Sequence, residues 1–151
     1  MPINHQKPTC HQEISHSIIK LTERGSRVKL DIENPPPNKR YLKTKIDGCY
    51  IKNQEAADYM LSCFLTKKSL LVELKGNNTA KGCDQLLATY GFLKEQGVFK
   101  DNAVPAVLVG TQVRPQSKSS VTTRIVKYQR LTQKKLHIYN RQHKALFESF
   151  F

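Results

Sequence analysis

The sequence predicts an α/β protein of a single domain, in which a central, mixed and mostly antiparallel sheet is flanked by helices. Residues 10–24 and 79–96 carry apolar side chains at helical spacing. Three apolar runs between residues 41 and 75 are separated only by short polar turns, as in an antiparallel meander. A further apolar run at residues 103–113 indicates a buried strand parallel to its neighbour. The expected order of the core is helix, three strands, helix and strand.

The length of the chain agrees with one domain. With 151 residues, of which 38% are apolar, the chain can bury a core of its own. We expect this core to span about residues 10–113. Residues 114–151 are expected to add a basic helix at 121–135 and a short strand at 136–140.

The first expected helix has an apolar stripe made of Ile14, Ile18 and Leu21, and Gly25 is its expected stop. Glu13 lies on the flank of this stripe. The three prolines at 35–37 then form a rigid, extended connector that neither a helix nor a central strand can cross.

The strands of the meander are expected at residues 41–51, 57–65 and 69–75. A polar Gly-Asn-Asn segment at 76–78 breaks the last strand, and Thr79 can cap the helix that follows. Gly97 is the expected stop of that helix.

The charge of the chain points to an anionic partner. The formal net charge is +13, and nucleic acid is the first candidate. The excess is uneven: residues 114–151 contain nine Lys or Arg and one acid, whereas residues 46–113 carry seven of each sign. The residues suited to chemistry thus lie in the neutral middle of the chain, and the basic excess lies at its ends.

The cysteines and the apolar runs exclude several other classes of protein. Cys10, Cys49, Cys63 and Cys83 are widely spread and form no C-x-x-C, which argues against a zinc site. We interpret them as four reduced thiols of a cytoplasmic protein. The polar first residues do not resemble a secretory signal, and no apolar run approaches the roughly 20 residues of a membrane span.

Glu73 and Lys75 are the residues most suggestive of chemistry. They end the apolar run of residues 69–75, and because side chains alternate on a strand, both point to one face while Leu74 points to the other. A carboxylate and an ammonium group at the end of an apolar strand are costly without partners or a function. Metal-assisted phosphodiester cleavage fits: Glu73 would hold Mg²⁺, and Lys75 would orient or help to deprotonate the attacking water.

With Glu-x-Lys on the third strand, this order of elements resembles the PD-(D/E)XK nuclease superfamily, which has the restriction-endonuclease-like fold. The resemblance covers about residues 10–113. It implies that an Asp on the second strand shares a divalent metal with Glu73, that the Leu74 carbonyl completes the coordination, and that Lys75 positions the water. Hard oxygen ligands favour Mg²⁺ or Mn²⁺ over zinc.

Two aspartates compete for the role of second metal ligand. Asp58 opens the second expected strand, fifteen positions before Glu73, which is enough for a strand, a tight turn and a strand back. The family's Pro before this Asp is Ala57 here. Asp47 lies on the first expected strand, in an Asp-Gly pair that is also frequent in turns. We favour Asp58, and either could instead be a solvated carboxylate at a strand end.

Two further residues match positions that some branches of the superfamily use. Gln85 lies in the first turns of the helix after Glu-x-Lys, away from the apolar stripe of that helix, where relatives place a cleft-facing Gln. Glu13 is a candidate for the extra metal ligand that some members carry on an N-terminal helix. The alternative for each is an ordinary solvated side chain.

The expected C-terminal helix carries basic residues at helical spacing beside an apolar stripe. Such a helix can pack on the sheet and follow DNA phosphates with its basic edge. The alternative is a solubilising surface, in which case DNA would cross the basic residues of 39–45 instead. The stripe consists of Arg124, Lys127, Arg130 and Lys134.

Taken together, these residues predict a Mg²⁺-dependent endonuclease acting on DNA, with Asp58, Glu73, Lys75 and Gln85 as its catalytic residues. A second copy of the chain is a further candidate partner. The alternatives are an inactive nucleic-acid-binding protein of the same fold, or a basic module that binds an acidic protein. The acidic pair discriminates between them, because a protein that only binds phosphate has no use for two adjacent carboxylates.

Overall fold

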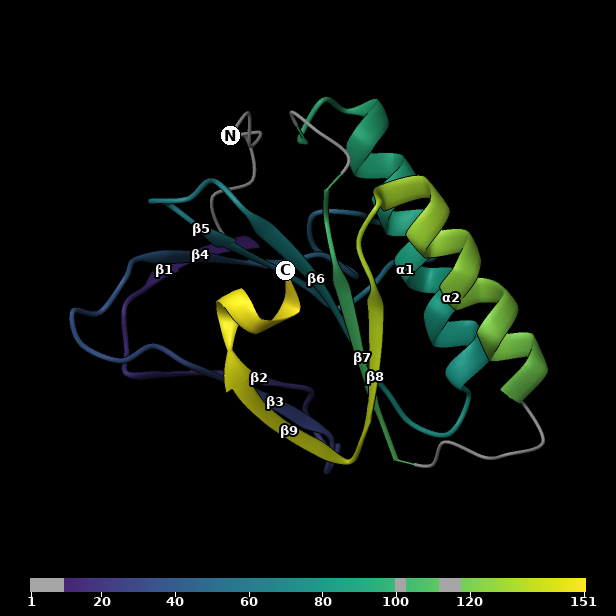
Figure 1. The fold of residues 1–151 in the computed structure, drawn as a ribbon, viewed down its shortest axis with the longest axis horizontal. Coiled ribbons are helices and arrows are strands. Elements are labelled where there is room, and N and C mark those ends of the chain that lie inside the picture. Colours follow the sequence, from purple (N-terminus) through teal and green to yellow (C-terminus); the bar gives the residue numbers. More distant parts are fainter. Residues whose placement is uncertain (1–9, 100–102, 112–117) are drawn as a thin grey trace.

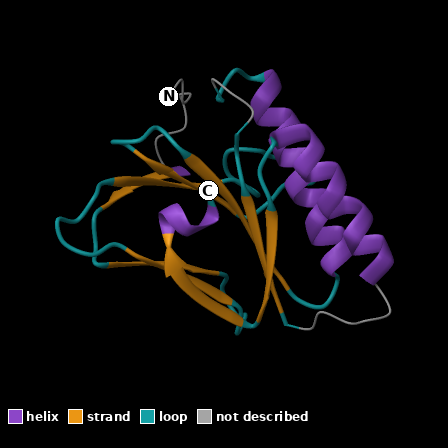
Figure 2. Ribbon diagram, in the orientation of Figure 1, coloured by secondary structure: helices purple, strands orange, loops and turns teal. Residues whose placement is uncertain are grey.

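The protein is described here from a computed structural model, which covers residues 10–99, 103–111 and 118–151. The fold is α/β (Figures 1 and 2). In chain order the strands and helices are β1 His11–Ile14, β2 Ile18–Thr22, β3 Lys29–Glu33, β4 Tyr41–Lys45, β5 Tyr59–Cys63, β6 Ser69–Lys75, α1 Thr79–Glu95, β7 Ala106–Gly110, α2 Lys118–Thr132, β8 Leu136–Asn140 and β9 Gln142–Leu146, followed by the 3₁₀ helix η3 Phe147–Phe150.

The strands form two sheets. The larger sheet has six strands in the order β1-β4-β5-β6-β7-β8 and is mixed. Its first four strands pair antiparallel, and β6, β7 and β8 pair parallel. The smaller sheet has the order β2-β3-β9, with β2 and β3 forming an antiparallel hairpin and β9 running parallel to β3.

The elements stack in three layers. Helices α1 and α2 lie side by side over one face of the six-stranded sheet, and the smaller sheet and η3 lie on its other side (Figure 1). Each interface holds its own apolar core. One core joins the two helices to the sheet through residues such as Leu71, Leu86 and Leu108, and the other joins the two sheets through residues such as Leu30, Val72 and Val109. Strands β6 and β7 are buried on both faces, which explains their nearly continuous apolar sequence.

The expected helix at residues 10–24 is wrong, because this segment forms β1, a short link and β2. Apolar residues four and three positions apart satisfy a helical spacing, but Ile19 and Leu21 also alternate with polar residues as a strand requires. Tertiary pairing decides between the two periods. Ile19 and Leu21 are fully buried against β3 and the larger sheet, and Ile18 and Thr22 face outward.

Residues 41–51 were also expected to form one strand, but β4 ends at Lys45. The next residues form a tight turn in which the Cys49 and Ile51 amides donate to the Ile46 carbonyl. Gly48, with a φ of 73°, takes the left-handed conformation that this turn requires. Asp47 consequently lies in a turn that leads from β4 back toward β5.

The remaining core elements follow the expected order. Strand β6 has the expected bounds, and α1 begins at Thr79, although the cap is the Asn78 side chain, which accepts from the Lys81 amide. Gly97, with a φ of 72°, follows the end of α1. Strand β7 is shorter than expected, and residues 112 and 113 of the expected strand lie outside the described residues. Helix α2 begins and ends about three residues earlier than expected, and β8 has the expected bounds.

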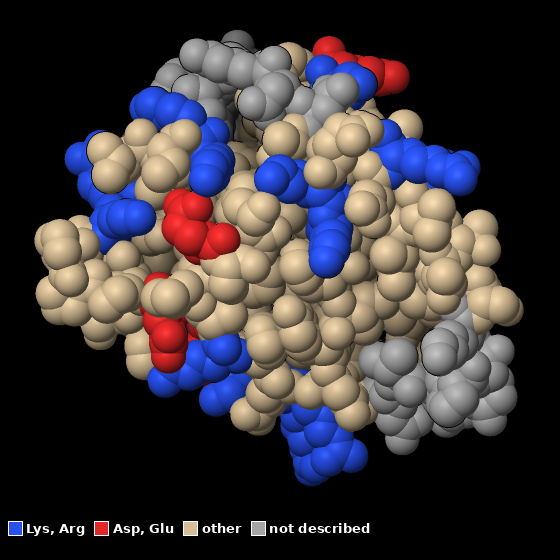
Figure 3. Space-filling model, viewed as in Figure 1, with Lys and Arg blue, Asp and Glu red and all other residues tan. Residues whose placement is uncertain are grey.

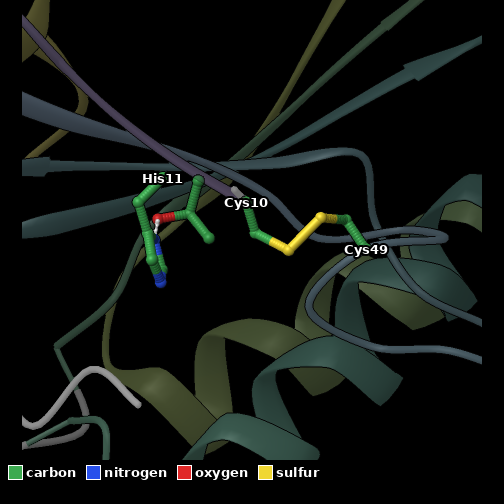
Figure 4. Close-up of a disulfide and its surroundings, with 4 residues drawn as sticks. Cys10, His11 and Cys49 are labelled. Atoms are coloured by element: carbon green, nitrogen blue, oxygen red, sulfur yellow. Dashed lines mark hydrogen bonds between the residues drawn. A yellow bond between two sulfur atoms is a disulfide. The ribbon is translucent and has the colours of Figure 1, made fainter. Parts of the chain in front are cut away.

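Two of the four cysteines are not thiols. Cys10 and Cys49 form a disulfide, whereas Cys63 and Cys83 are free and buried (Figure 4). The antiparallel register of β1 and β4 places His11 opposite Thr44, with a hydrogen bond between their side chains, so Cys10 lies beside the turn that follows β4. Spacing in the sequence could not reveal this proximity. The disulfide ties the start of β1 to the turn that contains Asp47.

Within the residues that the structure describes, neither helix has the length and apolar character needed to cross a membrane.

Candidate active site

Glu73 and Lys75 lie at the end of β6 and face α1. Leu74 points to the opposite face, into the core between the two sheets. The contact between α1 and the sheet is close because residue 82 is a glycine: a Cβ atom there would lie 2.5 Å from Cδ1 of Leu108. The same atom would lie at contact distance from Cγ of Glu73 (3.5 Å) and Cβ of Lys75 (3.4 Å). The Glu73 side chain is almost fully buried, and Lys75 is half-buried.

Asp58 lies beside Glu73 on the neighbouring strand. It immediately precedes β5, and the register that pairs Tyr59 with Val72 places Asp58 opposite Glu73. Its Oδ2 accepts a hydrogen bond of 2.8 Å from the Leu74 amide, and a further hydrogen bond joins the Asp58 and Glu73 carboxyl groups. The two acids predicted to share a metal are therefore in direct contact, at the same end of two neighbouring inner strands of the sheet.

This contact changes the protonation of both acids. Burial raises the pKa of Glu73, and the hydrogen bond to Asp58 and the charge of Asp58 raise it further, against the opposing effect of Lys75. Burial also raises the pKa of Asp58, although the hydrogen bonds from Glu73 and from the Leu74 amide oppose the increase. Burial and mutual repulsion thus favour a state in which the pair retains one proton, shared in the hydrogen bond between Glu73 and Asp58.

Gln85 approaches the same place from α1. Its Nε2 donates a hydrogen bond of 3.3 Å to the carbonyl of Ala56, two residues before Asp58. Its Oε1 is buried and makes no hydrogen bond to any described residue. Gln85 thus lines the same cleft as the two acids, and its buried oxygen has no hydrogen-bond partner among the described residues there.

These side chains line a cleft of about 530 Å³ at the end of the molecule where β6 ends and α1 begins. Asp47 also lines it, so both aspartates that competed for the metal reach the cleft, but Asp58 is the one in contact with Glu73. The opposite wall is the loop between β2 and β3, through Glu23, Gly25, Ser26 and Arg27, and Thr111 contributes from the end of β7.

The oxygen atoms of the site fit a magnesium ion. Asp58 and Glu73 supply two carboxylates, and Oε2 of Glu73 is buried without a hydrogen-bond partner among the described residues. We expect the Leu74 carbonyl to face the same side as the Leu74 amide, toward Asp58, because the two groups of one strand residue point to the same neighbour. The described ranges contain no group of three or more His, Cys, Asp or Glu that could hold a metal. A two-carboxylate site suits Mg²⁺, which keeps several waters and commonly binds through one or two carboxylates and substrate phosphate.

Glu13 is not at this site. It lies on the edge strand β1 rather than on a helix, it is exposed, and its carboxylate lies 3.9 Å from Arg40. The register places Glu13 opposite Leu42, three residues before the end of β4 nearest the cleft. The expectation of Glu13 as a metal ligand depended on the helix that this segment does not form.

The basic residues expected on the C-terminal helix do not form one free stripe. Arg124 makes an ion pair of 2.8 Å with Asp84 of α1, and Lys134 lies beyond the end of α2, where its Nζ donates to the Phe151 carbonyl. Lys127 and Arg130 are exposed on α2. None of the four lines the cleft.

Two groups of residues that build the site were not predicted from the sequence. Gly82 allows α1 to approach the strand that carries Glu73 and Lys75. A glycine inside a helix, one turn before Gln85, could have indicated this close packing from the sequence. The β2–β3 loop was missed because its strands were interpreted as a helix. Alternating apolar residues on both sides of Gly25, such as Ile19, Leu21 and Leu30, could have predicted the hairpin.

The chain matches no protein-family model, no curated protein and no solved structure. Function is therefore inferred from the geometry of the cleft.

Proposed function

We propose that this protein is a Mg²⁺-dependent nuclease of the PD-(D/E)XK type that hydrolyses phosphodiester bonds in DNA. The observation that carries the proposal is the contact between Asp58 and Glu73, with Lys75 two residues further along the same strand face. Two adjacent buried carboxylates repel each other when both are ionised, and a bound cation removes that repulsion. A protein that only binds phosphate would gain nothing from them.

Each residue has a separate role. Asp58 and Glu73 would hold the ion, with the Leu74 carbonyl beside them, and the Leu74 amide fixes the orientation of Asp58. When bound, Mg²⁺ lowers the pKa of a coordinated water and stabilises the charge that develops on the phosphate. Lys75 would orient the attacking water and stabilise negative charge near the scissile phosphate. Gln85 would accept a hydrogen bond from that water or from the substrate through its unpartnered Oε1.

The first test is nicking of supercoiled plasmid by the purified protein in Mg²⁺, in Mn²⁺ and in chelator. We expect cleavage in both metals and none in chelator. Glu73→Gln and Lys75→Ala should each abolish detectable cleavage, with a loss on the order of 10²–10⁴ for the lysine. Glu95→Gln and Lys52→Ala change the same residue types at exposed positions that do not line the cleft and serve as controls. Cleavage by Lys75→Ala at the wild-type rate would contradict its role.

Metal binding can be tested without activity. Mg²⁺ should raise the melting temperature of the wild-type protein, because a ligand that binds only the folded state stabilises it. The same ion should have no effect on Glu73→Gln and should still stabilise Glu95→Gln. An equal shift in all three proteins would show that the ion binds elsewhere.

A further inference from the structure

The loop between β2 and β3 lines the same cleft as the acidic pair and carries two exposed arginines, Arg24 and Arg27. Arg27 lines the cleft itself, and Arg24 lies next to the lining residues Glu23 and Gly25. Neither guanidinium has an ion-pair or hydrogen-bond partner among the residues described. Two unpaired guanidinium groups beside a proposed catalytic site are available to an anionic ligand.

The loop is held in place relative to the acids. Tyr59, the residue after Asp58, donates a hydrogen bond of 2.9 Å from its hydroxyl to the Thr22 carbonyl at the end of β2. At the start of the loop, the Glu23 carboxylate lies 2.9 Å from Nζ of Lys45. The position of the arginines is thus coupled through Tyr59 to the strand that carries the proposed metal ligand.

The charges around the cleft show why such groups are needed. Four carboxylates line it, and they would repel a polyanion: Glu23, Asp47, Asp58 and Glu73. Lys45 neutralises Glu23, and a bound cation would neutralise Asp58 and Glu73. Attraction of a nucleic acid then depends on cations at the rim, of which Arg24 and Arg27 have no other partner in the described chain.

Helix α2 is a weaker candidate for the same task. Arg124 is paired with Asp84, Lys134 is bound to the C-terminal segment, and none of the four basic residues of the expected stripe lines the cleft. In Figure 3, Lys and Arg side chains lie across the upper part of this face and also project at its lower end, where the β2–β3 loop and the β8–β9 turn lie in Figure 1.

We infer that the β2–β3 loop is the DNA-binding wall of the cleft, and that Arg24 and Arg27 bind backbone phosphates on either side of the phosphodiester that Asp58 and Glu73 act on. The guanidinium group suits this role, because its planar fork matches two phosphate oxygens and it stays charged at any physiological pH. Contacts of this kind carry no sequence information, so recognition through this wall is independent of sequence. The inference rests on the proposed function, which places DNA in the cleft.

The experiment compares two double variants that lose the same charge. Arg24→Ala/Arg27→Ala removes the loop cations, and Lys127→Ala/Arg130→Ala removes two exposed cations of α2. Both are made in the Glu73→Gln background, and binding of a labelled DNA duplex is measured by fluorescence anisotropy in chelator over a range of salt. We expect the loop variant to bind at least tenfold more weakly and its log–log salt slope to fall by about 1.8, or 0.9 for each lost phosphate contact. The α2 variant should stay within about threefold of its parent.

A further variant keeps the inference testable if the alanine variant is unstable. Arg24→Lys/Arg27→Lys retains both charges and should recover the salt slope with part of the affinity. Equal losses in the loop and α2 variants would overturn the inference, because they would reflect net charge alone.

The outcomes separate this inference from the proposed function. If wild-type protein cuts DNA but the loop variant keeps full affinity, the inference is wrong and the nuclease proposal stands. If wild-type protein binds without cutting and the loop variant loses affinity, the inference stands and the hydrolytic proposal is wrong. Failure of the wild-type protein to bind any duplex would overturn both.

Discussion

The two walls of the cleft differ in burial, charge and origin. On the sheet wall, Asp58 and Glu73 are 7% and 2% exposed. Glu73 lies in β6 and Asp58 directly before β5, and both strands have an apolar core on each face. On the loop wall, Arg24 and Arg27 are exposed on a two-stranded hairpin of the smaller sheet. The difference matches two physical tasks. Groups that hold an ion gain from a rigid, poorly hydrated setting, whereas groups that attract a polymer must reach solvent.

Helix α1 packs closely on the sheet wall at Gly82, and a substitution there should have the largest effect on stability and activity of those predicted below. In Gly82→Ala, the new Cβ would lie 2.5 Å from Cδ1 of Leu108, a fully buried side chain, and would reach ordinary van der Waals contact with Glu73 and Lys75. We expect the free energy of unfolding to fall by about 1–2 kcal/mol, as in other overpacked cores. Nicking activity should fall at least tenfold, because relief of the Leu108 clash shifts α1 relative to β6 and β7, and misplacement of a catalytic group by even 1 Å can cost about 10²-fold in rate.

The matched control lies in the same helix. Gly91 is exposed, and a Cβ there would meet nothing within 4 Å. Gly91→Ala should therefore stabilise the protein by about 0.5–1 kcal/mol and leave cleavage unchanged. A Gly82→Ala protein that is as stable and as active as Gly91→Ala would mean that Leu108 moves aside without cost.

The protonation of the sheet wall makes stability depend on pH. The pKa of Glu73 is raised above its ordinary value of 4.5, so the folded state retains a proton that the unfolded chain releases. The retained proton therefore stabilises the folded state fully below pH 4.5, and this stabilisation is lost as the pH rises through the raised pKa of Glu73. The pKa of Asp58 is also raised, so its titration changes stability in the same direction. Metal-free wild-type protein should therefore lose stability as the pH rises from 5 to 9.

Glu73→Gln removes this titration. At pH 8 the metal-free variant should be more stable than wild type by about 1–2 kcal/mol, since one pKa unit is worth about 1.4 kcal/mol. Denaturant unfolding at several pH values in chelator measures the difference, with the exposed Glu95→Gln as the control. A variant that is less stable than wild type at pH 8 would show that Glu73 has a stabilising partner in the absence of metal.

The hydrogen bond that connects the two walls, from the Tyr59 hydroxyl to the Thr22 carbonyl, should have the smallest effect when it is removed. Tyr59→Phe removes the hydrogen bond to the Thr22 carbonyl and should lower the free energy of unfolding by about 1 kcal/mol. Because the loop then moves more freely relative to Asp58, DNA affinity should fall a few-fold, without a change in the salt slope. Tyr139→Phe is the control, since the Tyr139 hydroxyl makes no hydrogen bond within the described ranges. A changed salt slope in Tyr59→Phe would indicate the loss of a phosphate contact instead.

The sheet wall was predictable because its evidence is local. An apolar run ending in Glu-x-Lys, a polar break and a capped helix specify strand, turn and helix within about 30 residues, and the alternation of the strand decides that Glu73 and Lys75 share a face. Asp58 needed one further step. A tight antiparallel return brings it opposite Glu73, and the short turn between β5 and β6 permits that register.

The loop wall was not predictable in the same way. The apolar residues of β1 and β2 fit both the spacing of a helix and the alternation of a strand. Only their pairing with β4 and β3 shows that these segments are strands. Strand β9, which completes the smaller sheet, comes from the far end of the chain, and its pairing with β3 depends on contacts that no local pattern encodes.

By itself, the sequence determined the α/β class, the order of elements from β4 to β8 and the pair Glu73 and Lys75, because hydrophobic period and turn chemistry act over a few residues. Only the tertiary structure decided that Asp58 rather than Asp47 contacts Glu73, that Cys10 meets Cys49, that Arg124 is neutralised by Asp84, and that an arginine-bearing hairpin closes the cleft. These outcomes depend on strand register and on the packing of two sheets, which join residues far apart in the chain and follow from the lowest free energy of the whole fold.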